Sequence, residues 1–309
     1  AITIDTSTEG ISTGEADLNL DASLNISNGS VASTGGIVSL SGGGQLSGTG
    51  ILDVSGGNWV LGGDFVKSSG TLTTSETNLE LEGSSITFTS DEALSFDNLT
   101  LNNFTLTLGD NSSDLTVENA ITIDNSTEGI LTGGADLSLG ALTLSAGDVT
   151  STGGIISLLG GGQLSGSGIL DVSGSTWVLV GNFVKSGGTL TTSNTDLALG
   201  GSTTLTSDEA LSFVTLNLND FTLILGSSTS DLTVQNAITI DASTEGISTG
   251  EADLILKSAL TMSNGLLEST GGAIKLAHDQ TSKFSENAFM MLDETLLTSD
   301  DGIGIAFIE

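Results

Sequence analysis

The sequence contains no cysteine, no proline, no tyrosine and no arginine, and it has one histidine among 309 residues. Without cysteine the chain forms no disulfide, so the redox compartment is left open. Zinc–thiolate sites and cysteine nucleophiles are excluded for the same reason. No run of 18 apolar residues occurs, and the sequence therefore predicts no helix that spans a bilayer.

Basic residues are scarce as well. Five lysines stand against 38 acidic residues, which gives a formal net charge of −33. Nucleic acids and anionic membrane surfaces are bound through clustered lysine and arginine, so the composition argues against both as partners. Water, cations and uncharged glycans remain as the counterparts of such a surface.

One 20-residue phrase is present three times. It reads AITIDTSTEGISTGEADLNL at 1–20, AITIDNSTEGILTGGADLSL at 120–139 and AITIDASTEGISTGEADLIL at 237–256. The second copy begins 119 residues after the first, and the third begins 117 residues after the second. Self-similarity at a nearly fixed period predicts stacked repeats, not separate globular domains.

We therefore expect one continuous solenoid over residues 1–277, built from repeats 1–119, 120–236 and 237–277. Residues 278–309 depart from the repeat, and we interpret them as a divergent C-terminal turn, a cap or the start of a further unit. The chain begins without methionine at a repeat boundary. We interpret it as a mature protein or as a window of a longer one.

Short apolar segments within one repeat follow two ladders that advance by about 20 residues. The first ladder consists of Ile2–Ile4, Leu18–Leu20, Val38–Leu40, Trp59–Leu61, Leu79–Leu81 and Leu99–Leu101, and the second of Ile11, Val31, Ile51, Leu72, Leu94 and Leu115. Two ladders with one step are typical of a parallel β-solenoid, in which each turn places a side chain above its equivalent. The sequence thus predicts an all-β, single-chain parallel β-helix of about 15 turns, with about 20 residues per turn and about six turns per repeat.

Tandem β-sandwich repeats are the alternative fold, because antiparallel sandwiches also consist of short alternating strands. Sandwiches favour turns every 8–12 residues, whereas this chain advances by about 20. The copies also follow each other without a linker, and the junction Leu115–Ile123 is itself strand-like. Both arguments favour the solenoid.

Two repeated motifs are candidates for binding. GGGQLSG occurs at 42–48 and at 160–166, but a phosphate cradle would need a following lysine and a helix start. We interpret this motif as corners of the coil, where glycine supplies a positive φ. Trp59 and Trp177 occupy equivalent positions, each followed by Phe-Val-Lys. We interpret both as core residues, with contact to a glycan as the alternative.

Acidic residues recur within each copy of the phrase. They are Asp5, Glu9, Glu15, Asp17, Asp124, Glu128, Asp136, Asp241, Glu245, Glu251 and Asp253. We interpret them as solvated turns, with occasional Ca²⁺ sites as the alternative, although neither an EF-hand loop nor a calcium-binding nonapeptide is present. The acids repeat evenly and no arginine accompanies them, so we predict no catalytic cleft and no enzyme activity.

Threonine pairs also lie on expected strands. They are Thr71/Thr73, Thr87/Thr89 and Thr105/Thr107. Flat Thr-x-Thr ladders are typical of ice-binding solenoids, but Ser, Asp and Glu interrupt the pairs here. His278 is not accompanied by a serine or cysteine nucleophile elbow and is interpreted as an ordinary tail residue. The sequence assigns no catalytic, cofactor-binding or metal-ligating residue, and no cofactor beyond the Ca²⁺ alternative.

Residues 33–56 read STGGIVSLSGGGQLSGTGILDVSG and are echoed at 151–174. Together with the T-L-T-L and I-T-I-D strands, this pattern resembles the repeat regions of large secreted bacterial adhesins of the filamentous-haemagglutinin and autotransporter-passenger kind. The resemblance covers nearly the whole chain. It implies a right-handed parallel β-helix, export from the cell, and a role in adhesion or surface structure.

These observations predict a structural, non-catalytic rod or fibre-forming segment of an extracellular bacterial surface protein or filament, with a role in adhesion. The expected partners are further turns, through end-to-end self-association or continuation within a longer chain, and surface glycans. The alternatives are a calcium-stabilised glycan-binding adhesin module and an ice-binding solenoid. The expected location is the bacterial cell surface.

Overall fold

The structure is a computed structural model that describes residues 1–276, 281–285, 288–292, 297–299 and 305–308. The described chain is all-β, and its strands form a parallel β-solenoid of about 13 turns with about 21 residues per turn. The predicted fold class is confirmed. Within the described residues, no helix is long and apolar enough to cross a membrane.

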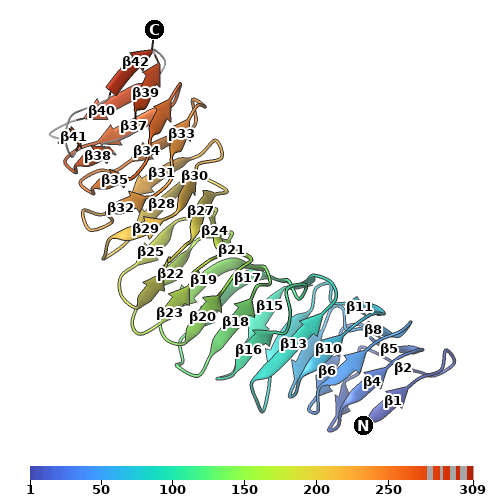
Figure 1. Cartoon of the computed structure of the whole chain (residues 1–309). Helices are drawn as coiled ribbons and strands as arrows, with labels where there is room; N and C mark the ends of the chain where they lie inside the picture. Colours follow the sequence, from blue (N-terminus) through green and yellow to red (C-terminus); the bar gives the residue numbers. More distant parts are fainter. Residues whose placement is uncertain (277–280, 286–287, 293–296, 300–304, 309) are drawn as a thin grey trace. The chain divides into compact units, whose positions relative to one another are not determined.

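The chain divides into two compact units, which we describe separately. Unit 1 comprises residues 1–155 and 167–169, and unit 2 comprises residues 156–166 and 170–309. Each unit contains parallel strands that are stacked turn upon turn (Figure 1), three to nine residues long in unit 1 and three or four residues long in unit 2.

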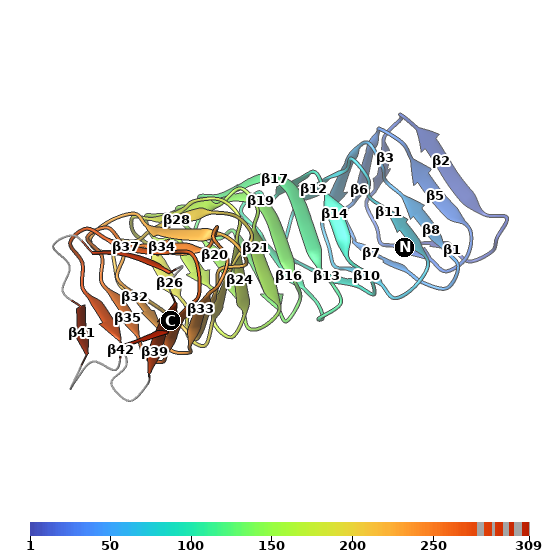
Figure 2. The same ribbon diagram turned by 90° about the horizontal axis from the view of Figure 1, so that it is seen from above.

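Three sheets make up the sides of the coil in unit 1. The first side carries β1 (Ile2–Ile4), β4 (Leu24–Ile26), β7 (Gly44–Leu46), β10 (Phe65–Lys67), β13 (Ile86–Ser90), β16 (Thr105–Leu108), β18 (Gly129–Gly133) and β20 (Asp148–Ser151). The second side carries β2 (Gly10–Gly14), β5 (Ser30–Ser33), β8 (Ile51–Asp53) and β11 (Thr71–Thr73), which lie side by side in Figure 2. The third side carries β3 (Leu18–Leu20), β6 (Ile37–Leu40), β9 (Asn58–Leu61), β12 (Asn78–Leu81) and β15 (Asn98–Thr100). Further along the chain, β14 (Leu94–Phe96) pairs with β17 (Leu115–Ile123), which pairs with β19 (Leu137–Leu144).

In the sheets of unit 2, strands likewise pair with the strand three places further along the chain. Its strands from β21 to β31 are β21 (Ile155–Leu158), β22 (Gly162–Leu164), β23 (Ile169–Asp171), β24 (Thr176–Leu179), β25 (Phe183–Lys185), β26 (Thr189–Thr191), β27 (Asp196–Leu199), β28 (Thr203–Thr206), β29 (Leu211–Phe213), β30 (Thr215–Asn217) and β31 (Thr222–Leu225). The later strands are β32 (Leu232–Val234), β33 (Ile238–Ile240), β34 (Gly246–Ser248), β35 (Leu254–Leu256), β36 (Leu260–Met262), β37 (Leu266–Ser269), β38 (Ile274–Leu276), β39 (Ser282–Ser285), β40 (Phe289–Leu292), β41 (Leu297–Ser299) and β42 (Ile305–Ile308). Thus β22 pairs with β25, and β32 pairs with β35.

Inward-facing side chains stack on their equivalents in the next turn. On the third side of unit 1, the register aligns Leu18, Val38, Trp59, Leu79 and Leu99 in one column and Leu20, Leu40, Leu61 and Leu81 in another. From the second turn onward these side chains are buried. Alternation with period 2 turns the intervening residues toward solvent, so apolar triplets suffice to build the core. Five of the six triplets predicted for the first ladder align in this way.

Each turn has three strands, whereas the sequence predicted two ladders. The ladder that the prediction missed is the first side, whose inward positions include Lys67 and Ser90 and therefore show a weak apolar alternation. Ile2–Ile4 belongs to this side, because it pairs with Leu24–Ile26. The second ladder was also placed one residue off at β8, since Ile51 is 43% exposed and Leu52 is buried.

The repeat is one strand short of six full turns, which corrects the expected six turns per repeat. The strands β1 to β16 and residues 115–117 of β17 make 17 strand segments before Ala120 opens the second copy. Because a turn takes three strands, the phrase reappears one side short of its earlier position around the coil. Within unit 1, β2 accordingly lies on the second side, whereas its copy β18 lies on the first.

Strands from the divergent segment continue the parallel pairing of unit 2. β39 pairs with β36, β40 with β37, β41 with β38, and β42 with β39. The last of these strands, β42, comprises Ile305–Ile308. Ile303 and His278 lie outside the described residues.

Asparagine side chains form a polar ladder on unit 1. The Asn78 amide donates to Oδ1 of Asn58 at 2.9 Å, Asn98 donates to Asn78 at 2.6 Å, and Asn119 donates to Asn98 at 3.3 Å. An amide both donates and accepts, so one residue type can repeat along such a ladder. We refer to Asn58, Asn78, Asn98 and Asn119 as the asparagine ladder.

Candidate functional site

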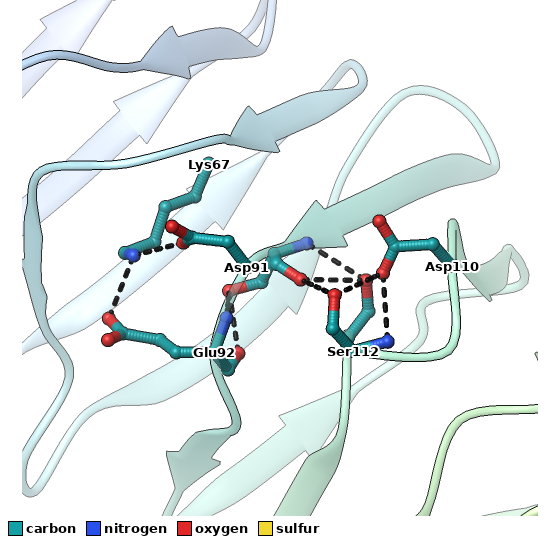
Figure 3. A network of polar contacts seen from close by, with 7 residues as sticks. Lys67, Asp91, Glu92, Asp110 and Ser112 are labelled. Carbon is teal, nitrogen blue, oxygen red and sulfur yellow. Dashed lines mark hydrogen bonds and ion pairs between the residues drawn. The ribbon is translucent and has the colours of Figure 1, made fainter.

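The lysine of the repeated Phe-Val-Lys strand points into the coil. Alternation along β10 places Phe65 and Lys67 inside, while Val66 is exposed. Lys67 pairs in register with Ser90 at the end of β13, so its ammonium reaches the corner that follows. There, Nζ forms ion pairs with Asp91 and, at 3.0 Å, with Oε1 of Glu92 (Figure 3).

Unit 2 contains the same cluster. Lys185 is 3% exposed and forms ion pairs with Asp208 and, at 3.2 Å, with Glu209. In both units the lysine is buried, whereas the side chains of its acidic partners are about half exposed. We refer to each set as a lysine–carboxylate cluster.

The charges of these clusters stabilise one another. Burial lowers the pKa of Lys67, but its hydrogen bonds to Asp91 and Glu92, together with their negative charges, outweigh burial and hold that pKa above its ordinary value. The pKa of Lys185 is raised in the same way. The hydrogen bond from Lys185 holds the pKa of the Asp208 carboxyl below its ordinary value, against a smaller opposing effect of desolvation. A protonated lysine is neither a nucleophile nor a base, so the arrangement anchors a corner of the coil.

A second polar network lies one turn further in unit 1 (Figure 3). The Ser90 backbone N–H donates to Ser113 Oγ at 2.9 Å, and Ser113 Oγ donates to Asp110 Oδ1 at 2.8 Å. Ser112 Oγ also lies 2.8 Å from Asp110 Oδ1. The hydrogen bonds from Ser113 and Ser112 hold the pKa of the Asp110 carboxyl below its ordinary value. In unit 2, Ser227 stands at the equivalent position and carries no charge.

Trp59 and Trp177 are core residues, as the sequence predicted. Both are 0% exposed, which leaves neither indole available to a glycan. Trp59 packs edge-to-face on Phe65, with 4.9 Å between ring centroids, and Trp177 packs in the same way on Phe183. Perpendicular packing is a geometry that aromatic quadrupoles favour.

The acids of the repeated phrase accept hydrogen bonds from backbone N–H groups at corners. Glu9 accepts from Asp5 at 2.9 Å, and Glu245 accepts from Asp241 at 2.7 Å. The later aspartates of the phrase accept from the next turn. These bonds join Asp17 to the N–H of Ile37, Asp136 to that of Ile155, and Asp253 to that of Ala273. Among the described residues, no group of three or more Asp, Glu or His side chains could hold a metal ion.

The remaining sequence motifs are structural where they are described. Gly43, Gly48, Gly161 and Gly166 of the glycine-rich motif have positive φ angles of 66°, 60°, 80° and 58°, as expected for corners. The threonine pairs do not form one ladder. On the first side, Thr87 stacks on Thr107, but Thr105 stacks on Gly129. Thr71 lies on the second side, where it stacks on Ile51.

A groove on unit 2 lies where the strand ladder is interrupted. β26 is the last strand of its sheet, and β29 is the first strand of the next. Between them is a hollow of about 480 Å³ whose lining includes Asn194, Ser212, Val214 and Gln235. Thr192 Oγ1 bridges the interruption by donating to the Ser212 carbonyl oxygen at 2.9 Å. We refer to this hollow as the unit 2 groove.

The lysine–carboxylate clusters and the groove were not predicted from the sequence. A signal for the clusters was present, because Lys67 and Lys185 each stand two residues after a buried phenylalanine and thus on the same face of the strand. No comparable signal exists for the groove. The groove depends on the interruption of strand pairing between β26 and β29, and the spacing of these two strands in the sequence is about the same as elsewhere in the coil.

The fold and the polar clusters define this chain as a parallel β-solenoid whose corners are held by ion pairs and side-chain hydrogen bonds. Comparisons with protein families, with curated proteins and with solved structures find no match for it.

Proposed function

We propose that the chain is a structural, non-catalytic segment of a bacterial surface protein or filament, and that it supplies length at the cell surface with a role in adhesion. The supporting observation is the stacking of equivalent side chains from turn to turn, which makes each turn a template for the next. Solenoid stability is a sum of such neighbour contacts, so added turns add length without a new core.

The first turn offers a surface for a further turn. Leu18 and Leu20 are only partly buried, whereas their copies Leu137 and Leu139 are 0% exposed beneath a preceding turn. A preceding turn, from this chain or from another copy, would bury the first pair in the same way. Such stacking supports the proposed end-to-end association or continuation.

Insertion of a second copy of residues 120–236 tests the structural role. The inserted block holds 17 strands, or about 5.7 turns, and at about 4.8 Å per turn it should increase the longest dimension by about 27 Å. Small-angle scattering and electron microscopy of the original and extended chains would measure the increment. The matched control inserts residues 120–226, which lack β32 and so break the strand order of the natural junction with residue 237, and it should lower the melting temperature. An extended chain of unchanged length would contradict the proposal.

A further inference from the structure

The unit 2 groove has an uncharged wall in a strongly acidic chain. Its lining residues carry amide, hydroxyl and apolar side chains and include none of the 38 acidic residues. Its volume of about 480 Å³ falls within the range of about 300–1,000 Å³ that small-molecule sites occupy.

The corresponding corner of unit 1 differs at three positions. Seven of the ten lining residues are identical in the two repeats. The other three positions hold Asn194, Val214 and Gln235 in unit 2 and Glu76, Asp97 and Glu118 in unit 1. The change removes three negative charges from one corner while leaving the backbone plan intact, since Thr74 in unit 1 donates to Ser95 as Thr192 donates to Ser212.

The two sets of side chains recognise different chemistry. A carboxylate only accepts hydrogen bonds, whereas the amides of Asn194 and Gln235 both donate and accept. Sugar hydroxyl groups also donate and accept, so an amide can satisfy them in either sense. Val214 and Ala210 add apolar surface for the C–H faces of a sugar ring.

A side-chain hydrogen bond and the packed core beneath the unit 2 groove hold its lining in place. Gln235 Nε2 donates to Ser212 Oγ at 3.1 Å, which links two neighbouring turns. Phe213 is 1% exposed and Leu190 is 9% exposed, so the floor of the groove is part of the packed core. Asn194 has a φ of 55°, a left-handed conformation that asparagine tolerates better than most residues.

We propose that the unit 2 groove binds a neutral oligosaccharide through Asn194, Ser212 and Gln235, and that the acidic corner of unit 1 does not. The net charge of −33 opposes an anionic ligand, which leaves neutral glycans as the class that this lining fits. This inference supplies a ligand for the adhesive part of the proposed function and rests on it. The insertion experiment measures length alone, so the structural part can fail or succeed independently.

Titration calorimetry on the full 309-residue chain tests the proposal. The probes are cellotetraose, mannotetraose, xylotetraose and laminaritetraose, with tetragalacturonate as the anionic counterpart. At least one neutral probe should bind with a stoichiometry of one, and tetragalacturonate should bind at least about tenfold more weakly. Absence of binding by all four neutral probes, or equal binding of the anion, would overturn the proposal.

The triple substitution Asn194→Glu, Val214→Asp and Gln235→Glu gives the unit 2 groove the side chains of unit 1. It should weaken binding of the neutral probe at least about tenfold, because hydrogen-bond donors are lost and repulsive charge is added. The matched control is Asn182→Asp, which also copies unit 1 but lies outside the groove lining, and it should leave the affinity unchanged. Unchanged binding by the triple variant would also overturn the assignment.

The reciprocal substitution keeps the proposal testable if the triple variant fails to fold. Glu76→Asn, Asp97→Val and Glu118→Gln give unit 1 the lining of unit 2. The stoichiometry for the neutral probe should then rise from one to two. A stoichiometry that remains at one would show that these three side chains do not determine recognition.

Discussion

Units 1 and 2 share many of their buried residues and differ in the charge of their surfaces. Trp59 and Lys67 have identical copies in Trp177 and Lys185, and all four are at most 3% exposed. Among exposed positions, Glu76 becomes Asn194 and Glu118 becomes Gln235. A buried side chain must fit the turns above and below it, whereas an outward side chain meets solvent and can change without affecting its neighbours.

An acidic side chain of unit 1 can serve as a hydrogen-bond acceptor at a corner where its negative charge is not required. Asp64 Oδ1 accepts the backbone N–H of Thr87 at 2.7 Å, and Asn182 Oδ1 accepts that of Thr204 at 2.9 Å. The amide oxygen thus replaces the carboxylate oxygen at the same corner. This pair shows how one repeat can lose charge without losing structure.

The largest expected difference between the units concerns their aromatic cores. Trp59 packs against Phe65, Phe88 and Phe96. Trp177 packs against Phe183 and Phe213, and Leu205 stands where unit 1 has Phe88. Trp59→Ala should destabilise unit 1 by about 3–5 kcal/mol. Trp177→Ala should cost unit 2 about 0.5–1.5 kcal/mol less, the value of one aromatic pair.

Hydrogen exchange resolved by peptide, with and without urea, would measure the two losses separately. Phe88→Leu is the matched control, because it gives unit 1 the residue of unit 2. It should bring the cost of Trp59→Ala down to that of Trp177→Ala. An equal cost in the two unmodified units would contradict the aromatic explanation.

The lysine–carboxylate clusters should behave alike in both units. Asp91→Asn with Glu92→Gln leaves the buried Lys67 without anionic partners and should destabilise unit 1. Because the carboxylates are half exposed, the loss of stability should be smaller than the value for breaking a fully buried ion pair, which is about 3–5 kcal/mol. Asp208→Asn with Glu209→Gln should act in the same direction in unit 2. Urea unfolding would measure both.

Lys67→Met serves as the control for these variants, since it removes the buried charge together with its need for partners. It should be nearly neutral, within about 1 kcal/mol, as for other ion pairs replaced by apolar residues. The raised pKa of Lys67 also determines how the stability of unit 1 changes at alkaline pH. Its stabilising effect is complete below the unfolded pKa of about 10.4 and is lost as pH rises through the higher folded pKa. A Lys67→Met variant less stable than the double acid variant would refute this account.

The asparagine ladder should give a smaller difference. Asn78→Ala removes two side-chain hydrogen bonds, one to Asn58 and one from Asn98, and should cost about 1–3 kcal/mol. At the equivalent position of unit 2, Asp196→Ala removes one bond, from Thr215 at 2.6 Å, and should cost about half as much. Urea unfolding would compare them, and equal costs would show that the ladder adds no stability as a network.

The smallest expected effect is a response to acid at one corner. Hydrogen bonds from Ser113 and Ser112 lower the pKa of Asp110, so their stabilising effect is present above the unfolded pKa of about 3.9. It is lost as pH falls through the lower folded pKa. The amide resonance of Ser112, which donates to Asp110 at 3.1 Å, should report this titration by NMR. Asp110→Ser copies Ser227 of unit 2 and should abolish it, and a titration that survives this change would assign it to another group.

Sequence alone predicted the solenoid and two of its three sides, because apolar residues recur on both at every turn. The first side was missed because Gly44, Lys67 and Ser90 occupy positions that an apolar pattern would have marked. Ile51 was misplaced for a different reason, since Ile51 and Leu52 are adjacent and both apolar, and only the register shows which of them faces inward.

The candidate sites were harder to predict than the fold. A buried lysine violates the expectation that charge lies outside, yet its spacing from Phe65 contained the information. The groove depends on which strands stop pairing, and the sequence carries no sign of that. Comparison of the repeats with each other, position by position, would still have marked Glu76 and Asn194 as a difference in charge.

The count of 17 strands per repeat has a consequence for direction. The phrase falls back by one side at each junction between copies, because 17 strands are one short of six turns. In unit 1, β18 continues the side that holds β16, and in unit 2, β34 pairs with β31, the copy of β16. Within unit 1, an outward residue in the first copy of the phrase therefore has its equivalent on a different side of the coil in the second copy, so duplication by 17 strands presents the same side chain on a new face.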